Sequence, residues 1–289
     1  MSASITHLQH LLLHRLPSRT DTFLAHLSRL LSTASGRDSL LCTAFYTLAF
    51  THAQLLRLLS RKYERLAETI AQNASKSLLP GEAFVATIEP PHLQLTETCV
   101  AVKSLGDAID EVRTFWRLRG LVDIYAAARE NSLRPSRDPV LKSIVWAKIL
   151  VQAGYQFYEN AAYLVKKGVL RSERFAKREA GWWTVSSQFW FADVLLEFVR
   201  LARVRQLRWN EEFGAQEVEE KEGKVGIKSK ELEEQWWLQL YANLGWFPNA
   251  VHWGWYDGSE EGPLNETMIG LTGFVPGFIN LRAAWAATE

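Results

Sequence analysis

Four basic side chains recur at spacings that place them together along one part of a helix. They are Arg57, Arg61, Lys62 and Arg65. Guanidinium and ammonium groups of this kind attract anionic lipid headgroups. With Glu64 and Glu68 the stretch carries a net charge of +2, worth about 2 kcal/mol at roughly 1 kcal/mol per charge near a membrane surface. The chemistry suggested by these residues is therefore electrostatic binding rather than bond making.

The same stretch carries large apolar side chains on the other side of the helix, and Leu58 alone points to the polar side. The apolar residues are Leu55, Leu56, Leu59, Tyr63 and Leu66. Each contributes up to about 1.5 to 3 kcal/mol if it is fully buried. Apolar burial would therefore exceed the contribution of the charges, and binding would show only modest salt sensitivity.

These residues belong to one long helix that is expected over residues 37–70. It follows Gly36, contains no Pro or Gly, and would be about 51 Å long at 1.5 Å per residue. A continuous apolar stripe runs along it from Leu41 to Ile70, while residues 39–56 carry no formal charge. Two interpretations remain open: a core helix of a bundle with a solvated charged face, or a helix that lies in a membrane interface.

Composition restricts the class of protein. The chain has 289 residues, a net charge of +1 and 47% hydrophobic residues, which excludes a globally basic nucleic-acid binder and a disordered chain. Its two cysteines, Cys42 and Cys99, form no metal or disulfide motif. The 12 Trp residues are typical of membrane interfaces, although they also serve in ordinary cores.

Helix start and stop signals divide the rest of the chain. A helix is expected from about residue 94 to 130, another from Asp138-Pro139 to near Gly168, and a third after Ser172. We expect an N-terminal extension (1–20), N-terminal helices (21–75), a linker (76–91), a central helical region (92–212), a charged flexible loop (213–230) and a hydrophobic C-terminal hairpin (231–289).

Two uncharged stretches near the C-terminus, residues 235–256 and 267–281, predict that hairpin. Gly273 and Gly277 form a small-xxx-small pair, which permits close approach of two helices in a bilayer. In water these glycines and Pro276 would weaken a helix. The pattern thus favours a membrane-embedded or tightly packed hairpin over an exposed helix.

No catalytic, metal or cofactor motif is found. His7, His10 and His14 share a helix face, but no further ligand is adjacent. Nucleotide loops, nucleophile elbows and zinc-protease motifs are absent from the sequence. We therefore predict no enzyme activity, no cofactor and no bound metal. The arginines at 113, 117 and 119 suggest either a charged flank on a packed helix or snorkelling side chains at a headgroup boundary.

A series of short motifs, taken in order, resembles the peroxin-eleven family of peroxisomal membrane proteins. The residues are Gly36-Arg37-Asp38, Leu40, Leu41 and Tyr46; Arg113, Trp116-Arg117-Leu118 and Gly120; Tyr158-Glu159-Asn160, Tyr163, Leu164 and Gly168; Trp183, Ser186 and Trp190; and Asn243, Pro248, Gly270, Gly273, Gly277 and Trp285. Each motif is weak, but their order is fairly specific. The Trp-rich C-terminal half looks closest to a divergent fungal branch.

The resemblance implies an all-α, membrane-associated bundle of long amphipathic helices with a hydrophobic C-terminal hairpin. It implies a peroxisomal membrane protein that elongates the membrane by helix insertion and promotes fission and proliferation. Leu55, Leu56, Leu59, Tyr63 and Leu66 would face lipid, with Arg57, Arg61, Lys62 and Arg65 at the headgroups.

Further expectations concern partners. These are membrane lipids with anionic headgroups, other copies of the chain and fission adaptor or dynamin-like machinery, with no nucleic acid. Gly270, Gly273 and Gly277 would serve as anchor or oligomer contact. The alternative functions are an oligomeric peroxisomal pore or metabolite channel, and a soluble helical adaptor.

Overall fold

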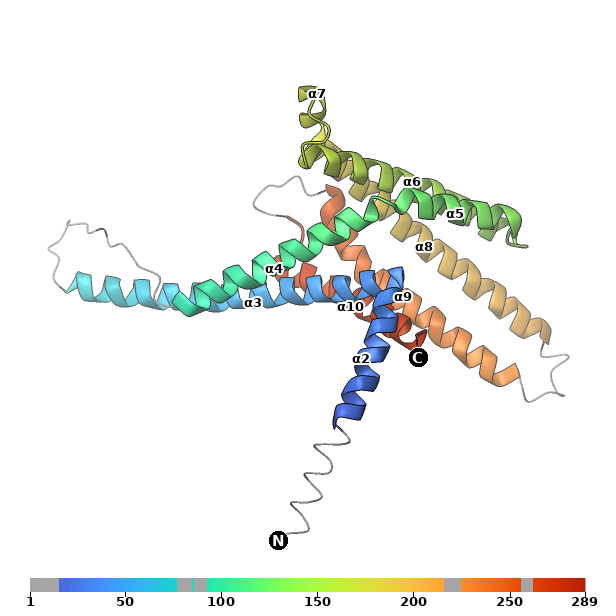
Figure 1. Ribbon diagram of the computed structural model, residues 1–289, viewed down its shortest axis with the longest axis horizontal. Helices are drawn as coiled ribbons and strands as arrows, with labels where there is room; N and C mark the ends of the chain where they lie inside the picture. The colour runs from blue at the N-terminus through green and yellow to red at the C-terminus, as the bar shows by residue number, and fades with distance from the viewer. Residues whose placement is uncertain (1–15, 77–84, 86–92, 216–224, 256–261, 289) are drawn as a thin grey trace, which may run out of the picture.

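The computed structural model describes residues 16–76, 85, 93–215, 225–255 and 262–288 (Figure 1). Every regular element in these residues is an α-helix, which confirms the all-α fold. The helices are α2 (Leu16–Ser32), α3 (Ala34–Ser75), α4 (Leu93–Arg117), α5 (Gly120–Leu133), α6 (Pro139–Lys166), α7 (Glu173–Ala176), α8 (Glu179–Ala215), α9 (Val225–Trp255) and α10 (Glu266–Ala286).

The long helices form a closed series of neighbours. Helix α3 packs against α4 and α10, α10 against α9, α9 against α8, and α8 against α6, which returns to α4. Consecutive members are antiparallel, as the pairs Lys148–Glu197 and Gln152–Asp193 show for α6 and α8. The first and last long helices of the chain are therefore direct neighbours, and α2 meets the end of α10 through His26 and Trp285.

Helix α3 confirms the long helix expected over residues 37–70 and extends it at both ends. Thr33 caps it, because its side-chain oxygen accepts a hydrogen bond from the backbone N–H of Gly36 at 3.0 Å. Its 42 residues correspond to about 63 Å at 1.5 Å per residue. Its buried residues all lie between Gly36 and Ala53, so only the first half of α3 belongs to the core.

The single helix expected over residues 94–130 is wrong, because the chain breaks between α4 and α5. The Leu118 carbonyl accepts a hydrogen bond from the Asn160 side chain at 3.2 Å instead of continuing the helical ladder. Gly120 lies against Gln156, whose side chain leaves no room for a Cβ at that position. The contact with α6 thus ends α4 and redirects the chain.

The predicted limits of α6 are confirmed. The Asp138 carboxylate accepts a hydrogen bond from the backbone N–H of Leu141 at 2.7 Å, and a proline occupies the first turn. The helix ends before Gly168, whose φ of 69° suits glycine. The helix expected after Ser172 is divided into the short α7 and the long α8.

The two C-terminal helices are antiparallel and closely packed. Gly245 of α9 lies against Pro276 of α10, and the Asn249 amide donates to the Ile269 carbonyl at 3.3 Å. Both helices continue through an internal proline. Of the expected charged loop, residues 216–224 lie outside the described residues, whereas residues 225–230 belong to α9. The histidines at 7, 10 and 14 and most of the expected linker also lie outside them.

Candidate functional site

The second half of α3 contains the residues predicted to contact lipid, and none of them is buried. Leu56 is 36% exposed, while Leu55, Leu59, Tyr63 and Leu66 are half-buried. Leu58, on the predicted polar side, is 45% exposed. Among the described residues of α3, none after Ala53 is buried. Of the five predicted lipid-facing side chains, Leu56 is therefore exposed and the other four are partly covered.

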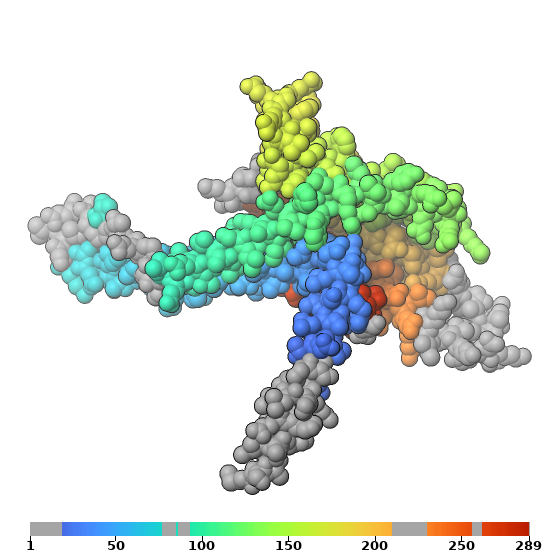
Figure 2. Space-filling view, in the orientation of Figure 1, coloured from blue at the N-terminus to red at the C-terminus, as the bar shows by residue number. Residues whose placement is uncertain are grey.

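The predicted headgroup-binding residues lie on the same half. Arg57, Arg61 and Arg65 are exposed, and no ion pair joins them to a described residue. Lys62 is half-buried. Figure 2 shows the second half of α3 and the start of α4 as an arm that extends away from the remaining helices, and the ribbon of α3 extends past the start of α4 in Figure 1. The structure thus brings all nine predicted residues onto the accessible end of one helix.

The first half of α3 has a different environment. Within the described chain, α3 is the one helix whose length and composition would allow it to cross a membrane. A core helix can meet that criterion too, and here α4 and α10 already cover the first half. The apolar residues between Ser39 and Ala53 are therefore used in packing within the chain.

Gly270, Gly273 and Gly277 all face the first half of α3. A Cβ on Gly270 would come within 2.6 Å of the Phe50 backbone nitrogen, and one on Gly277 within 3.2 Å of the Thr43 Cα. A Cβ on Gly273 would overlap the Tyr46 ring. The three glycines therefore let α10 approach α3 of the same chain closely. Their predicted role as anchor or oligomer contact is a separate matter and stays a prediction.

A cluster of charged and polar side chains joins α3, α4 and α6. Arg113 pairs with Asp38 at 3.3 Å, and Arg117 binds the Glu159 carboxylate at 3.0 Å and 2.9 Å. The side chains of Arg113 and Glu159 are only 8% and 6% exposed. Arg113 and Arg117 thus pair with carboxylates of neighbouring helices, which agrees with a charged flank on a packed helix and not with snorkelling side chains.

Tyr155 completes this cluster on α6. Its hydroxyl donates to Glu159 at 2.9 Å. Burial raises the pKa of Tyr155 above its ordinary value, and the Glu159 carboxylate adds to the rise, so the phenol stays protonated and remains a donor. Each oxygen of Glu159 thereby has a partner, which a buried carboxylate requires. The cluster holds helices together and presents no paired acid and base for catalysis.

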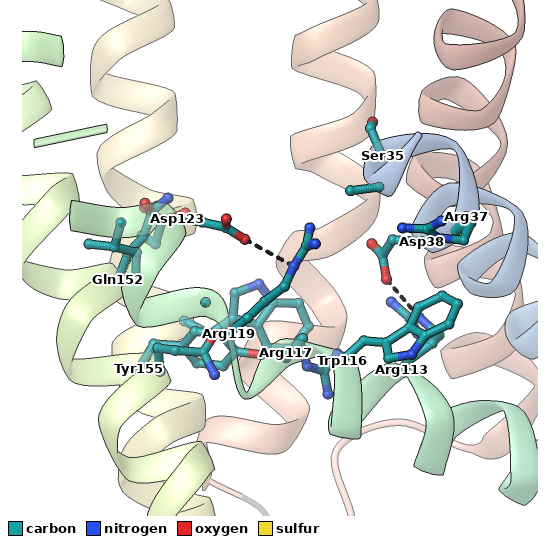
Figure 3. A pocket seen from close by; sticks show the side chains of 16 residues that line it. Ser35, Arg37, Asp38, Arg113, Trp116, Arg117, Arg119, Asp123, Gln152 and Tyr155 are labelled. Atoms are coloured by element: carbon teal, nitrogen blue, oxygen red, sulfur yellow. Dashed lines mark hydrogen bonds and ion pairs between the residues drawn. The ribbon is translucent and has the colours of Figure 1, made fainter. Parts of the chain in front are cut away.

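The cluster unites short motifs that lie far apart in the sequence. Asp38, Arg113, Arg117 and Glu159 come from three helices, and Asn160 reaches the Leu118 carbonyl between α4 and α5. Figure 3 shows Asp38 and Arg113 on one side of this region and Tyr155 on the other. The spacing of these residues along the chain gave no sign that they meet, although their opposite charges are the signal that pairs them.

The chain was compared with models of known protein families. The family model described as Peroxisomal biogenesis factor 11 (PEX11) matches residues 84–285. The chain belongs to the PEX11 family. The matched range contains α4 to α9 and almost all of α10 but begins after α3, so the family assignment does not depend on the amphipathic helix.

Membership fixes the cellular setting. PEX11 proteins are peroxisomal membrane proteins that act in peroxisome proliferation, and the family is one of biogenesis factors rather than of known enzymes. No curated protein and no solved structure matches the chain significantly. The predicted family and location are thereby confirmed, while the mode of action has to be argued from the structure.

Proposed function

We propose that this PEX11 protein elongates the peroxisomal membrane by inserting the second half of α3 into the cytosolic leaflet, and that elongation promotes fission. The observation that carries this proposal is the unburied surface of α3 after Ala53, where Leu56 and its apolar neighbours lie beside the exposed Arg57 and Arg61. A helix of this kind binds with its apolar side among the acyl chains and its basic side at the headgroups.

The physical mechanism is a wedge. A helix buried in one leaflet expands the area of that leaflet and favours positive curvature, and many copies side by side favour a tubule. The first half of α3 is fixed between α4 and α10. The inserting second half would therefore be held by the packed first half of the same helix and would not behave as a free peptide.

The remaining parts have supporting roles in this proposal. The α9–α10 hairpin serves as membrane anchor. Because α3 of the same chain covers Gly270, Gly273 and Gly277, the contact between copies of the chain lies on the exposed side of α10, which carries Leu271 and Phe278. Adaptor and dynamin-like proteins would then divide the elongated membrane.

The test is overproduction of the full chain as a fluorescent fusion, with peroxisome length as the measurement. We expect the wild type to lengthen peroxisomes and the double variant Leu56→Glu, Leu59→Glu to stay at the peroxisomal rim without lengthening them. The control is Leu58→Glu with Gln72→Glu, which places two acidic residues on the polar side of the same helix and should still lengthen peroxisomes.

Equal lengthening by both double variants would contradict helix insertion. Solute flux through the reconstituted wild-type protein, without any change of vesicle shape, would favour the pore instead. Recovery of the protein in the supernatant after alkaline extraction would favour a helical adaptor.

A further inference from the structure

A cavity of about 600 Å³ opens where α3, α4, α5, α6 and α8 meet, near the polar cluster (Figure 3). This volume is in the range of small-molecule sites. Its lining combines apolar side chains with arginines. The apolar part includes Trp116, Ile124, Tyr155 and Trp190, and the arginines are Arg37, Arg113, Arg117 and Arg119. The cavity lies at the start of α3, away from the half proposed to enter the membrane.

Three of the four arginines have carboxylate partners. Arg113 pairs with Asp38, Arg117 with Glu159, and Arg119 with Asp123. The third aspartate of the lining, Asp193, pairs with Lys148 at 3.2 Å. Within the described chain Arg37 forms no ion pair, so the cavity keeps one positive charge without a counter-charge.

Arg37 is also incompletely hydrogen-bonded. Its Nη1 donates to the Leu31 carbonyl at 3.1 Å, and its guanidinium lies 5.3 Å from the centre of the Trp116 ring. Its Nε is buried and has no hydrogen-bond partner among the described residues. A guanidinium carries five donors, so Arg37, which lines the cavity, has donors left for an acceptor that a ligand supplies.

Arg119 supplies a second guanidinium from another element. It pairs with Asp123, and the side chains of Arg119 and Asp123 are 55% and 63% exposed. Exposed pairs of this kind are weak, so Arg119 can share its donors with a ligand. A carboxylate has two oxygens and a single negative charge. A phosphate offers further oxygens and can accept from two forks at once.

We propose that this cavity binds a phosphate group carried on an apolar body, with Arg37 as the main anchor and Arg119 as the second donor. The aromatic lining of Trp116 and Trp190 receives the apolar body. Such a ligand is either the headgroup region of an anionic lipid or a soluble phosphate ester. This inference goes beyond membrane insertion, because its residues are not on the inserting half of α3.

The experiment is calorimetric titration of the purified full chain with two probes, dihexanoyl phosphatidic acid and phenyl phosphate. We expect Arg37→Gln to weaken binding at least about tenfold, the effect of one hydrogen bond to a charged group. Arg119→Gln should also weaken binding. Because Arg119 is exposed, this variant should fold normally, so a loss of binding in it cannot be caused by misfolding. The control Arg129→Gln removes the same charge from an exposed position on α5 outside the cavity and should bind as the wild type.

Tighter binding of the lipid probe would identify a lipid source, and tighter binding of phenyl phosphate a soluble ester. Failure of the wild type to bind either probe, or equal binding by Arg37→Gln and the wild type, would overturn the proposal. The variant Leu56→Glu, Leu59→Glu should bind phenyl phosphate, which has no acyl chain, as the wild type does, so loss of membrane elongation and loss of ligand binding are separable results.

Discussion

Gly273 of α10 lies against the ring of Tyr46 of α3, with no room for even a methyl group between them. The two residues are at opposite ends of the sequence, yet Tyr46 is only 7% exposed and its ring also contacts Trp246 of α9 at a centroid distance of 5.6 Å. Gly273, together with Gly270 and Gly277, therefore sets the separation of α10 from α3.

Gly273→Ala should destabilise the protein, because the new methyl group forces α10 away from Tyr46. Overpacking of this kind costs about 1 to 3 kcal/mol, and a thermal unfolding curve of the purified chain would show the loss. Gly181→Ala is the control, since no heavy atom lies within 4 Å of a Cβ built there. It should leave stability unchanged or raise it slightly. Equal melting temperatures for the two variants would contradict the close contact.

Glu159→Gln should be among the most destabilising single substitutions. It removes the carboxylate that Arg117 and Tyr155 share and leaves a largely enclosed guanidinium without its counter-charge. Removal of one partner from a buried pair costs about 3 kcal/mol or more. Chemical denaturation would measure the loss in the free energy of unfolding. The charge-matched control is Glu130→Gln at an exposed position, whose stability should lie within about 0.5 kcal/mol of the wild type. A small effect at Glu159 would mean that the cluster does not hold α4 to α6.

Acid should weaken the junction of α6 and α8 through Asp138. The hydrogen bond from Arg203 lowers the pKa of Asp138, and the backbone N–H of Leu141 adds to the effect. Because the pKa is lower in the folded chain, the stabilisation is complete above the unfolded value of about 3.9 and disappears as the pH falls through the folded value.

Asp138→Asn tests this pH dependence, since asparagine keeps the helix cap and loses only the charge. The variant should melt below the wild type at pH 7 and approach it near pH 3. A difference in melting temperature that does not change with pH would show that capping alone accounts for the role of Asp138.

The basic residues of α3 should contribute to vesicle binding in a salt-dependent way. Arg57→Gln with Arg61→Gln removes two charges, each worth roughly 1 kcal/mol at an anionic surface, so affinity for anionic vesicles should fall by about 30-fold at low salt. Co-sedimentation would measure it, and the difference should shrink at high salt. Arg134→Gln with Arg137→Gln, at exposed positions outside α3, should bind as the wild type.

Local patterns predicted the helices well, because the signals are contained in short stretches. The Asp138-Pro139 start and the uninterrupted apolar stripe of α3 are of this kind. The break after α4 was missed, since it depends on the Asn160 side chain reaching the Leu118 carbonyl. Gly120 is a local stop signal near this position, but the sequence does not show its packing against Gln156 of α6.

The cavity at Arg37 was missed for a related reason. Its special feature is the lack of a counter-charge, which emerges only when Asp38 is taken by Arg113 and Asp123 by Arg119. Sequence order places Asp38 next to Arg37 and suggests the opposite pairing. The residues of α3 that we predict to bind the membrane, by contrast, could be proposed from their spacing and from the family resemblance, because a single helix carries all of them.

The pairing of α3 with α10 also has a consequence for biosynthesis. Phe50 leaves the ribosome long before Gly270, its partner in the finished fold, and at 5 to 20 residues per second the interval is roughly 11 to 44 s. Throughout that time the apolar side of α3 that α10 will cover is open to other contacts. The contact between α3 and α10 is therefore made only after the C-terminal helix has been translated.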